Sequence, residues 1–491
     1  TMVNENIDDP HIVFQGVDKR YGSTPVLERV ALEARRGDFV SIIGPSGSGK
    51  STLLRIAAGL TEASRGSCVY RGNTDGAKDI AYVFQDSTLL PWLNVAENVA
   101  LPLRIRGAVK RERLALTDEL LRRVGLGAIG ALYPRQLSGG MKMRVSIARA
   151  LSISPNLLLL DEPFGALDEM TRDALNEELL RLRELSLWTA LFVTHSVSEA
   201  VFLSSKIAVL AANPGRIADV VEVALPYPRT PSTRQMPEFG ELVRKRRPPF
   251  TLYKRRIPLL PRFEWSQLLL PILVGVLIVG LWYFAVIVIQ IPEYQMPLPH
   301  SVVMAGYHER AVLVSGAFQT LYACLLGFFT SVIGGLLLSL FLASSNWAFK
   351  GFYPYIIMLK MTPVIVVAPI IILWMGQGLV SIVAITFLIC FFPIVANTTL
   401  GLRSVDRDLV ELFEVYGASN RQMMLWLRLP AALPFFTSGL KIAAALTPIG
   451  ALYGDTIAGM GSSDEAGLGF LVVIFSAQFQ IPALFASAFV A

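Results

Sequence analysis

Cysteine and charge are both scarce in this sequence. Its cysteines, Cys68, Cys324 and Cys390, lie far apart among 491 residues and form no metal-ligand spacing. This usage excludes a disulfide framework and a cysteine-based metal site. Charged residues make up 17% of the chain, whereas soluble domains carry about a quarter. Because 53% of the residues are hydrophobic and the apolar excess lies in the second half, we expect that half to lie in lipid.

The N-terminus also lacks the basic and then apolar pattern of a signal peptide. We therefore expect the first domain to stay in the compartment where it is made. The net charge is +6, and much of the basic excess gathers at residues 244–247 and 254–256. Such runs can bind nucleic acid, but their position just before an apolar segment favours contact with anionic lipid headgroups.

A glycine-rich stretch in the first half has the spacing of a phosphate-binding loop. Glycines let the backbone turn its N–H groups toward phosphate oxygens. Lys50 is placed to reach the β- and γ-phosphates, and the hydroxyl of Ser51 to hold Mg²⁺. Residues 39–43 are typical of a buried strand, and residues 51–60 of a helix whose N-terminus faces the anion. The sequence therefore predicts a nucleoside triphosphate site, whose loop consists of Gly44, Pro45, Ser46, Gly47, Ser48, Gly49, Lys50, Ser51 and Thr52.

A second apolar strand, residues 157–160, ends in two carboxylates. At such a strand tip Asp161 can hold the Mg²⁺ shell, and Glu162 can orient or deprotonate the attacking water. Two acids after a strand are as often simply solvated. Their combination with the phosphate-binding loop favours the functional interpretation.

Ser138, Gly139 and Gly140 precede a helix and form a second anion site by the same backbone physics. In isolation this would be an ordinary helix-capping turn. One nucleotide does not need two phosphate cradles in one domain, however. The economical hypothesis is that the second cradle serves the nucleotide of another copy of the chain.

With these motifs in order, residues 12–225 resemble the ATP-binding cassette (ABC) family, an α/β P-loop ATPase fold. The resemblance implies that ATP and Mg²⁺ are bound. It assigns Walker A to the phosphate-binding loop, the end of Walker B to Asp161 and Glu162, and the signature to Leu137–Met141. It further matches Gln85 to the Q-loop, which senses the transmembrane domain and joins the metal site, and Asp168 to the D-loop. His195 matches the switch histidine that contacts the γ-phosphate, and Tyr21 the aromatic residue that stacks on adenine.

Three positions depart from the usual family pattern: Ser48, Met143 and Ser196 replace Cys, Gln and Asp. None removes a catalytic group, so we expect activity to survive. Leu89–Trp92, Phe164–Asp168 and Asn213–Ile217 are similar to segments of the ATPases of nitrate, sulfonate and taurine importers. This second resemblance describes a group of transporters and not one substrate.

The composition changes twice along the chain, which predicts an ATPase domain over 1–225, a proline-rich basic linker over 226–262 and a transmembrane domain over 263–491. We expect the linker to be extended. The second half is predicted to be an all-α polytopic domain whose last segment, from Ile481, is too short to cross. Either the sequence ends inside a sixth helix, which we favour, or the final helix is partial by nature. Leu468–Phe479 is expected to be a short or re-entrant helix at the outer surface. The predicted spans are Trp265–Ile291, Gly316–Ala343, Phe352–Met375, Leu379–Leu400 and Leu433–Ile457.

Basic residues of the loops favour a cytoplasmic ATPase domain. The resemblance to importers implies a bacterial inner (plasma) membrane. The loop after the fourth span resembles the coupling loop of type I importer-like permeases through Glu411, Gly417, Leu429 and Pro430, although it is also compatible with an ordinary hairpin. We expect a short amphipathic helix, a glycine stop and a non-helical return, which dock beside Gln85. Lys360, within the third span, either faces an anionic substrate or reaches back to the inner headgroups.

These features lead to the hypothesis of an importer half: a fused cassette and permease that acts as a homodimer with a periplasmic or lipid-anchored substrate-binding protein, among membrane lipids and without nucleic acid. Its substrate would be a small solute, such as a nitrate-, sulfonate-, taurine- or bicarbonate-like anion, or a pyrimidine or riboflavin precursor. An exporter, and a membrane-bound ABC complex that signals without transport, remain alternatives. The coupling-loop resemblance argues against an exporter.

Overall fold

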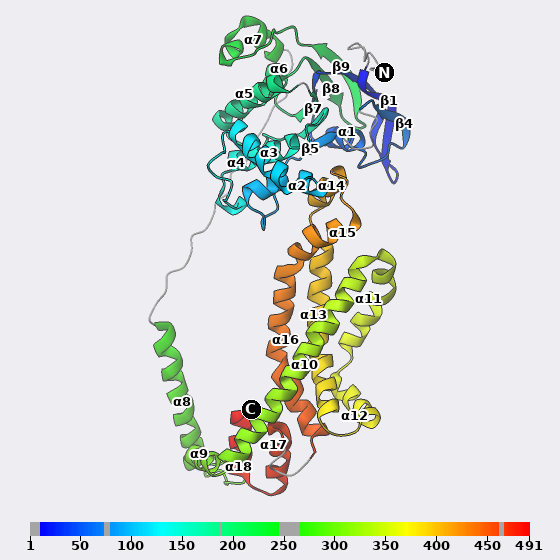
Figure 1. Ribbon diagram of the computed structural model, residues 1–491. Coiled ribbons are helices and arrows are strands. Elements are labelled where there is room, and N and C mark those ends of the chain that lie inside the picture. Colours follow the sequence, from blue (N-terminus) through cyan, green and yellow to red (C-terminus); the bar gives the residue numbers. More distant parts are fainter. Residues whose placement is uncertain (1–9, 73–78, 187, 245–265, 461–465) are drawn as a thin grey trace. The chain divides into compact units, whose positions relative to one another are not determined.

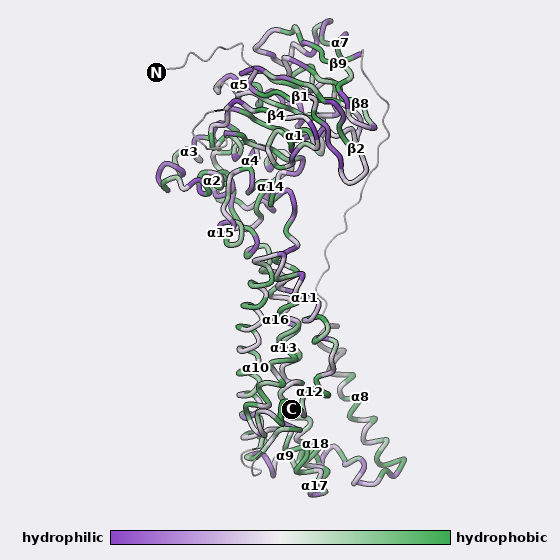
Figure 2. Tube along the Cα trace, turned by 90° about the vertical axis from the view of Figure 1, so that its right-hand side faces the viewer, coloured by the Kyte–Doolittle hydropathy of each residue, from purple (hydrophilic) through white to green (hydrophobic). Residues whose placement is uncertain are grey.

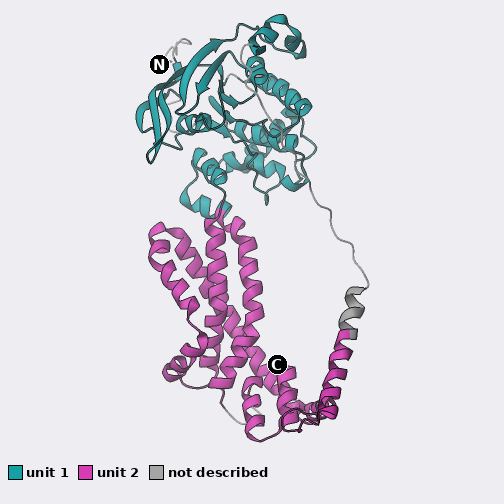
Figure 3. Ribbon diagram, turned by 180° about the vertical axis from the view of Figure 1, so that it is seen from behind, with its two compact units in different colours: residues 1–253, 406–427 teal, residues 254–405, 428–491 magenta. Residues whose placement is uncertain are grey.

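The structure is a computed structural model that describes residues 10–72, 79–186, 188–244, 266–460 and 466–491 (Figure 1). The chain forms two compact units (Figure 3). The first comprises Thr1–Tyr253 and Asp406–Leu427, and the second Lys254–Val405 and Arg428–Ala491. The first unit is α/β and the second is helical. A segment from the second half of the sequence therefore belongs to the α/β unit.

The α/β unit is built on a six-stranded sheet in the order β5-β6-β7-β3-β8-β9. All neighbouring strands are parallel except β8 and β9. Strands β3, β5, β6 and β7 are buried along their whole length, which explains their continuous apolar runs. The strands are β3 (Phe39–Ile43), β5 (Ile80–Val83), β6 (Leu157–Asp161), β7 (Thr189–Thr194), β8 (Lys206–Ala211) and β9 (Arg216–Glu222).

A three-stranded antiparallel sheet, in the order β2-β1-β4, completes the strands of this unit. It consists of β1 (Pro10–Tyr21), β2 (Thr24–Arg35) and β4 (Arg65–Tyr70). The helices of the unit are α1 (Lys50–Ala57), α2 (Val95–Ile105), α3 (Lys110–Arg123), α4 (Gly139–Leu151), α5 (Glu169–Leu185), α6 (Val197–Leu203), α7 (Pro237–Arg244), α14 (Arg407–Val415) and α15 (Asn420–Gln422). Short 3₁₀ turns span Pro134–Gln136 and Pro231–Gln235, and a π-helical stretch spans Met423–Arg428.

The start of the predicted linker differs from the extended chain that its composition suggests. The 3₁₀ turn at Pro231–Gln235 and helix α7 both lie in it, and α7 packs against α6. Arg229 is buried and its guanidinium donates hydrogen bonds to the carbonyl oxygens of Val201, Phe202, Ser204 and Leu225. It therefore caps the C-terminus of α6, an interaction that proline content does not reveal. The rest of the linker, residues 245–262, lies outside the described residues.

The helical unit is built around three long helices, α10 (Arg310–Ser344), α13 (Leu379–Arg403) and α16 (Leu429–Ala458), which pack against one another. Glycines permit close approach: a Cβ added to Gly327 would lie 2.5 Å from Thr386, and one added to Gly401 2.7 Å from Phe435. Hydrophobic segments run along these helices, whereas hydrophilic segments gather in the α/β unit (Figure 2). The other helices are α8 (Ser266–Val288), α9 (Pro299–His308), α11 (Asn346–Met361), α12 (Val364–Met375), α17 (Leu468–Ala477) and α18 (Ile481–Val490).

Among the described residues, three helices are long and apolar enough to cross a membrane, or four if one bent pair counts as a single span. They contain the predicted second, fourth and fifth spans. The predicted third span is instead broken into α11 and α12, which are bent by 99°. Thr362 and Pro363 cause the break, because proline disfavours helical geometry in the residue before it and cannot donate a backbone hydrogen bond.

The predicted first span falls on α8, in which the apolar stretch of described side chains is only Val274–Val288. The two apolar segments near the end of the sequence form short helices, as their length and their interrupting polar residues predict. They are α17 and α18, which pack on each other and share an apolar core with Val302 of α9 and Leu313 of α10.

Candidate nucleotide-binding site

The phosphate-binding loop connects β3 to α1, as its sequence predicts. Helix α1 begins at Lys50, and Gly49 before it has a φ of 89°, which favours glycine. A Cβ at Gly49 would also lie 2.6 Å from Cδ2 of Leu27. The amino end of α1 therefore opens directly onto the loop, the arrangement that presents backbone N–H groups to an anion.

Lys50 is 5% exposed and lies across its own loop. Its Nζ donates hydrogen bonds to the carbonyl oxygens of Gly44 and Pro45, both at 3.0 Å, and lies 3.7 Å from Oε1 of Glu162. The loop backbone thus holds the ammonium group near the carboxylate at the end of β6. A cation in this position is placed to neutralise phosphate oxygens held by the loop.

Asp161 and Ser51 meet where β6 ends. Oγ of Ser51 donates a hydrogen bond to Oδ1 of Asp161 at 2.9 Å, and the hydroxyl of Tyr82 donates one to Oδ2 at 3.1 Å. Burial raises the pKa of Asp161, and the two hydrogen bonds oppose that shift. A carboxylate beside a hydroxyl group is a hard oxygen donor set that suits Mg²⁺. The described residues contain no group of three or more His, Cys, Asp or Glu side chains suited to a metal. Mg²⁺ is usually held by one or two protein oxygen ligands together with water and substrate phosphate oxygens.

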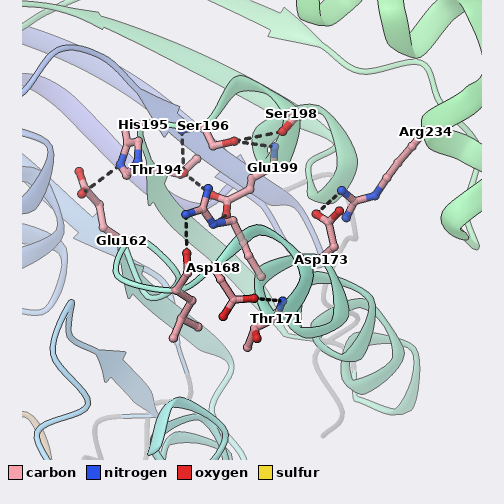
Figure 4. A network of polar contacts seen from close by, with 12 residues as sticks. Glu162, Asp168, Thr171, Asp173, Thr194, His195, Ser196, Ser198, Glu199 and Arg234 are labelled. Carbon is pink, nitrogen blue, oxygen red and sulfur yellow. Dashed lines mark hydrogen bonds and ion pairs between the residues drawn. The ribbon is translucent and has the colours of Figure 1, made fainter. Parts of the chain in front are cut away.

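Glu162 and His195 face each other across the tips of β6 and β7 (Figure 4). Nδ1 of His195 lies 3.3 Å from Oε2 of Glu162. This hydrogen bond lowers the pKa of Glu162 and raises that of His195. Glu162 also has a φ of 45°, a conformation that non-glycine residues rarely adopt and that often occurs at functional sites.

The signature segment (Leu137–Met141) lies against the D-loop (Gly165–Asp168) and the start of α5. Ser138 caps α4 by accepting a hydrogen bond from the N–H of Met141, and Asp168 caps α5 by accepting one from Thr171. A Cβ added to Gly140 would lie 2.8 Å from Thr171, and one added to Gly139 3.2 Å from Leu167. The structure therefore joins Ser138, Gly139 and Gly140 to the neighbourhood of Asp168, and brings Lys50, Ser51, Asp161, Glu162 and His195 together as a second group. The D-loop contacts this second group as well, because the N–H of Gly165 donates a hydrogen bond to the carbonyl oxygen of Glu162 at 3.1 Å.

The other two predicted site residues are at the surface. Tyr21 ends β1 and is 48% exposed, with Nζ of Lys19 at 5.0 Å from its ring. Gln85 is exposed two residues after β5. Their roles toward adenine and Mg²⁺ stay predictions.

The coupling segment (Asp406–Leu427) belongs to the α/β unit, where α14 packs against β5. Nε of Arg55 on α1 lies 2.8 Å from Oε2 of Glu411, and its Nη2 lies 3.3 Å from Oδ1 of Asp408. Gln422 donates a hydrogen bond to the carbonyl oxygen of Ile105 at the end of α2. The segment is therefore attached both to the helix that begins at Lys50 and to α2.

The coupling loop differs in part from its sequence prediction. Gly417 has a φ of 76° and ends α14, as a glycine stop requires. The expected non-helical return is instead helical, through α15 and the π-helical stretch. Leu429 and Pro430 are the first residues of α16 and directly follow the π-helical stretch. They therefore belong to the helical unit and not to the docked segment. Lys360 is exposed, one residue before the end of α11 at the break.

Sequence reasoning missed four residues of this region. Arg55 and Tyr82 bind the predicted site residues Glu411 and Asp161. Arg149 is fully buried and holds the carbonyl oxygens of Ser87 and Thr88, just after Gln85. The fourth is Gly215, whose added Cβ would lie 2.1 Å from the carbonyl oxygen of Ser48. The only local signal for any of them is that Arg55 and Arg149 are charged residues in mostly apolar stretches. That signal indicates a buried charge but not its partner.

Comparisons with known proteins match both halves of the chain. Residues 27–165 match the family described as ABC transporter, and residues 335–491 match the binding-protein-dependent transport system inner membrane component. A putative ATP-binding protein of Brucella abortus is 42% identical over 235 residues, which are 48% of this chain and 90% of that protein. The chain belongs to the ABC transporter family. It is an ABC ATPase joined to a permease domain, a membrane protein that couples ATP hydrolysis to transport, as the sequence predicts.

Other ABC relatives match the same half. The aliphatic sulfonates import ATP-binding protein SsuB of Bacillus cereus is 43% identical and covers 46% of this chain and 89% of its own length. An uncharacterized ABC transporter ATP-binding protein of Methanocaldococcus jannaschii is 44% identical over 44% of this chain and 82% of its own. Among solved structures, the ATP-binding cassette MJ0796 bound to ADP and Pi is 34% identical with a TM-score of 0.39, and covers 44% of this chain and 99% of that one.

Proposed function

We propose that this ABC transporter chain is half of an importer. Two copies would form the working transporter, each with one cassette and one permease domain, and would receive a small solute from a substrate-binding protein. The cassettes would lie on the cytoplasmic side of a bacterial inner membrane. Each would bind ATP with Mg²⁺, held by Ser51, Asp161 and Gln85, and Glu162 would serve as the general base for the attacking water.

The attachment of the coupling segment to the cassette carries this proposal. Glu411 and Asp408 bind Arg55 on α1, the helix whose first residue is Lys50. A change at the phosphates would reach α14 through this one short helix. Since a ligand shifts a conformational equilibrium only through contacts that differ between states, this path supports a transporter in which ATP changes the permease. The match of residues 335–491 to a binding-protein-dependent component supports import.

The different neighbours of the two anion sites support the homodimer. Ser138 and Gly140 lie against Leu167 and Thr171, whereas Lys50 and Ser51 bind Glu162 and Asp161. In this proposal the signature segment of one copy binds the nucleotide that is held by the phosphate-binding loop of the other copy. In this arrangement Tyr21 stacks on adenine, His195 contacts the γ-phosphate, and Asp168 lies beside the second copy.

The substrate that best suits this group is a small anion, with an aliphatic sulfonate first. Relatives that cover the cassette are named for sulfonate import. Lys360, exposed at the break between α11 and α12, supplies a cation that an anionic substrate would need on its path. Nitrate, taurine, bicarbonate and pyrimidine or riboflavin precursors complete the set to be tested.

Uptake into sealed vesicles tests the proposal. The full chain is reconstituted with its binding protein and ATP on the cassette side, and accumulation of each labelled solute is measured. We expect ATP-dependent accumulation of one solute, and none in the Glu162→Gln variant. Hydrolysis of ATP without accumulation of any of these solutes would reject import and leave the signalling alternative.

A further inference from the structure

Arg172, on the first turns of α5, connects the D-loop to another part of the ATP site. Its Nη2 donates a hydrogen bond to the carbonyl oxygen of Leu167 at 2.8 Å. Its Nε lies 3.4 Å from Oε1 of Glu199 on α6. One planar guanidinium group thus donates a hydrogen bond to a D-loop carbonyl with one nitrogen, and forms an ion pair with a carboxylate through another, without a hydrogen bond between Nε and Oε1.

Glu199 in turn holds the chain on both sides of the switch histidine. It is 5% exposed, and its Oε2 accepts a hydrogen bond from Oγ1 of Thr194, the last residue of β7. The N–H of Ser196 donates to the same Oγ1 at 3.0 Å, and Oγ of Ser196 accepts from the N–H of Glu199. Thr194, before His195, is therefore bound to the Glu199 side chain, and Ser196, after it, is bound to Thr194 and to the backbone of Glu199 (Figure 4).

The opposite charges of Arg172 and Glu199 oppose separation of the two side chains. A buried carboxylate is costly unless it is paired, and removal of one partner leaves the other charge uncompensated. Arg172 and Glu199 are thus held together by the cost of separating them. His195 lies at the end of this path, with Nδ1 3.3 Å from Oε2 of Glu162. Glu162 is the proposed general base for hydrolysis.

We propose that Arg172 and Glu199 are a positioning pair that ties the place of the D-loop to the orientation of His195 within one cassette. Neither residue belongs to the predicted nucleotide or metal site. The proposal rests on the proposed function, because the D-loop receives a signal only where a second copy lies beside Asp168. Arrival of that copy would move the carbonyl of Leu167, and Arg172 would pass the displacement to Glu199 and to the turn that carries His195. Hydrolysis in one cassette would thereby depend on the presence of the second cassette beside its D-loop.

Kinetics of the full chain in lipid nanodiscs test the pair. Arg172→Gln and Glu199→Gln are each expected to lower kcat for ATP by about 10- to 100-fold, because small misplacements of catalytic groups cost that much. KM for ATP is expected to stay within about twofold, since the pair does not bind nucleotide. The double variant should be no slower than the slower single variant, because both substitutions break one path.

A control pair on the same helix separates positioning from loss of stability. Arg144 and Glu178 join α4 to α5 at 3.1 Å, with comparable burial. Arg144→Gln and Glu178→Gln should lower the Tm by as much as the substitutions of Arg172 and Glu199 do. They should leave kcat near that of the wild type. Exchanging the charges, with Arg172→Glu and Glu199→Arg together, should not rescue kcat, because a carboxylate cannot donate to the carbonyl oxygen of Leu167.

The results distinguish this inference from the proposed function. If Arg172→Gln and Glu199→Gln reduce kcat no more than the control variants, or raise KM instead of lowering kcat, the positioning pair is rejected even though the wild type transports. Strictly additive single and double variants reject it as well. If the wild type hydrolyses ATP but moves no solute, the importer proposal fails, while the kinetic comparison of the pair still decides the inference.

Discussion

Arg55 and Glu411 form an ion pair of 2.8 Å, although 356 residues separate them in the sequence. Arg55 lies in the last turn of α1, and Glu411 is a buried residue of α14 that also binds Arg407. The pair joins the helix at the phosphate-binding loop to the coupling segment. It gives the most direct experimental access to the coupling between ATP and transport.

Breaking this pair should uncouple the chain. In the proposed importer, Glu411→Ala is expected to reduce stimulation of ATP hydrolysis by the loaded substrate-binding protein about tenfold, equivalent to about 1.4 kcal/mol, because Arg55 loses its main partner. This is less than for a fully buried pair, since Arg55 is 27% exposed. Arg407→Ala is the control: Arg407 binds the same carboxylate but is 75% exposed and should contribute little. Equal effects of both substitutions would contradict the assignment.

Glu162→Gln should abolish turnover but not ATP binding. The amide cannot accept the proton of the attacking water, so kcat is expected to fall by a factor of about 10²–10⁴. ATP should remain on the purified protein, with the two copies held together. Turnover is measured by phosphate release and retained nucleotide by chromatography after denaturation. Normal turnover would remove Glu162 from the role of base.

Tyr82→Phe should weaken metal binding without disturbing the fold. It removes the hydroxyl that orients Oδ2 of Asp161, and loss of such a supporting hydrogen bond typically costs 10- to 100-fold in metal affinity. We expect half-maximal ATP hydrolysis to require about tenfold more Mg²⁺. Tyr70→Phe removes an equivalent bond to Asp79, in another part of the unit, and should leave the Mg²⁺ dependence unchanged.

The pair of Glu162 and His195 should make stability depend on pH. The pKa of His195 is raised, so its contribution is complete below the ordinary value of 6.5 and is lost as the pH rises through the raised pKa. The pKa of Glu162 is lowered, so its contribution is present above the ordinary value of 4.5 and is lost as the pH falls through the lowered pKa. The Tm difference between wild type and His195→Ala, measured without nucleotide, should be largest between the ordinary pKa values of 4.5 and 6.5 and should shrink toward both acid and alkaline pH. A constant difference would contradict this.

Gly215→Ala should damage the nucleotide site from outside its motif. The new Cβ would lie 2.1 Å from the carbonyl oxygen of Ser48, so the phosphate-binding loop must shift, at a cost of about 1–3 kcal/mol. We expect a lower Tm and weaker ATP binding by calorimetry. Gly240→Ala, where the added Cβ meets nothing within 4 Å, should instead stabilise α7 by about 0.5–1 kcal/mol.

Much of the candidate site could be predicted because its chemistry is carried by short stretches. The strand at Phe39–Ile43 and the loop after it lie where the motif places them, and α1 begins at Lys50. Asp161 and Glu162 lie at the end of β6, beside Ser51 and Lys50. Adjacent parallel strands bring their carboxyl ends to one edge of a sheet, so strand-tip motifs meet there without further information.

The errors came where local pattern and packing compete. Phe352–Met375 has the length and hydropathy of one span, but Thr362 and Pro363 break it into two helices. The proline-rich start of the linker folds onto α6 because Arg229 finds carbonyl acceptors there. In the first case the apolar segment exists but is two helices and not one. In the second the proline-rich segment exists but its start is folded and not extended.

By itself the sequence determined the elements from which this protein's chemistry is predicted: a phosphate-binding loop, two carboxylates at a strand tip, a histidine at the next strand tip and a long apolar second half. Each follows from residue types at fixed spacing, because backbone turns and strand tips are local. Only the tertiary structure decided which charges meet, such as Arg55 with Glu411 and Arg172 with Glu199. Those pairs join residues on different helices, and the cost of burying an unpaired charge, not the spacing of residues, selects them.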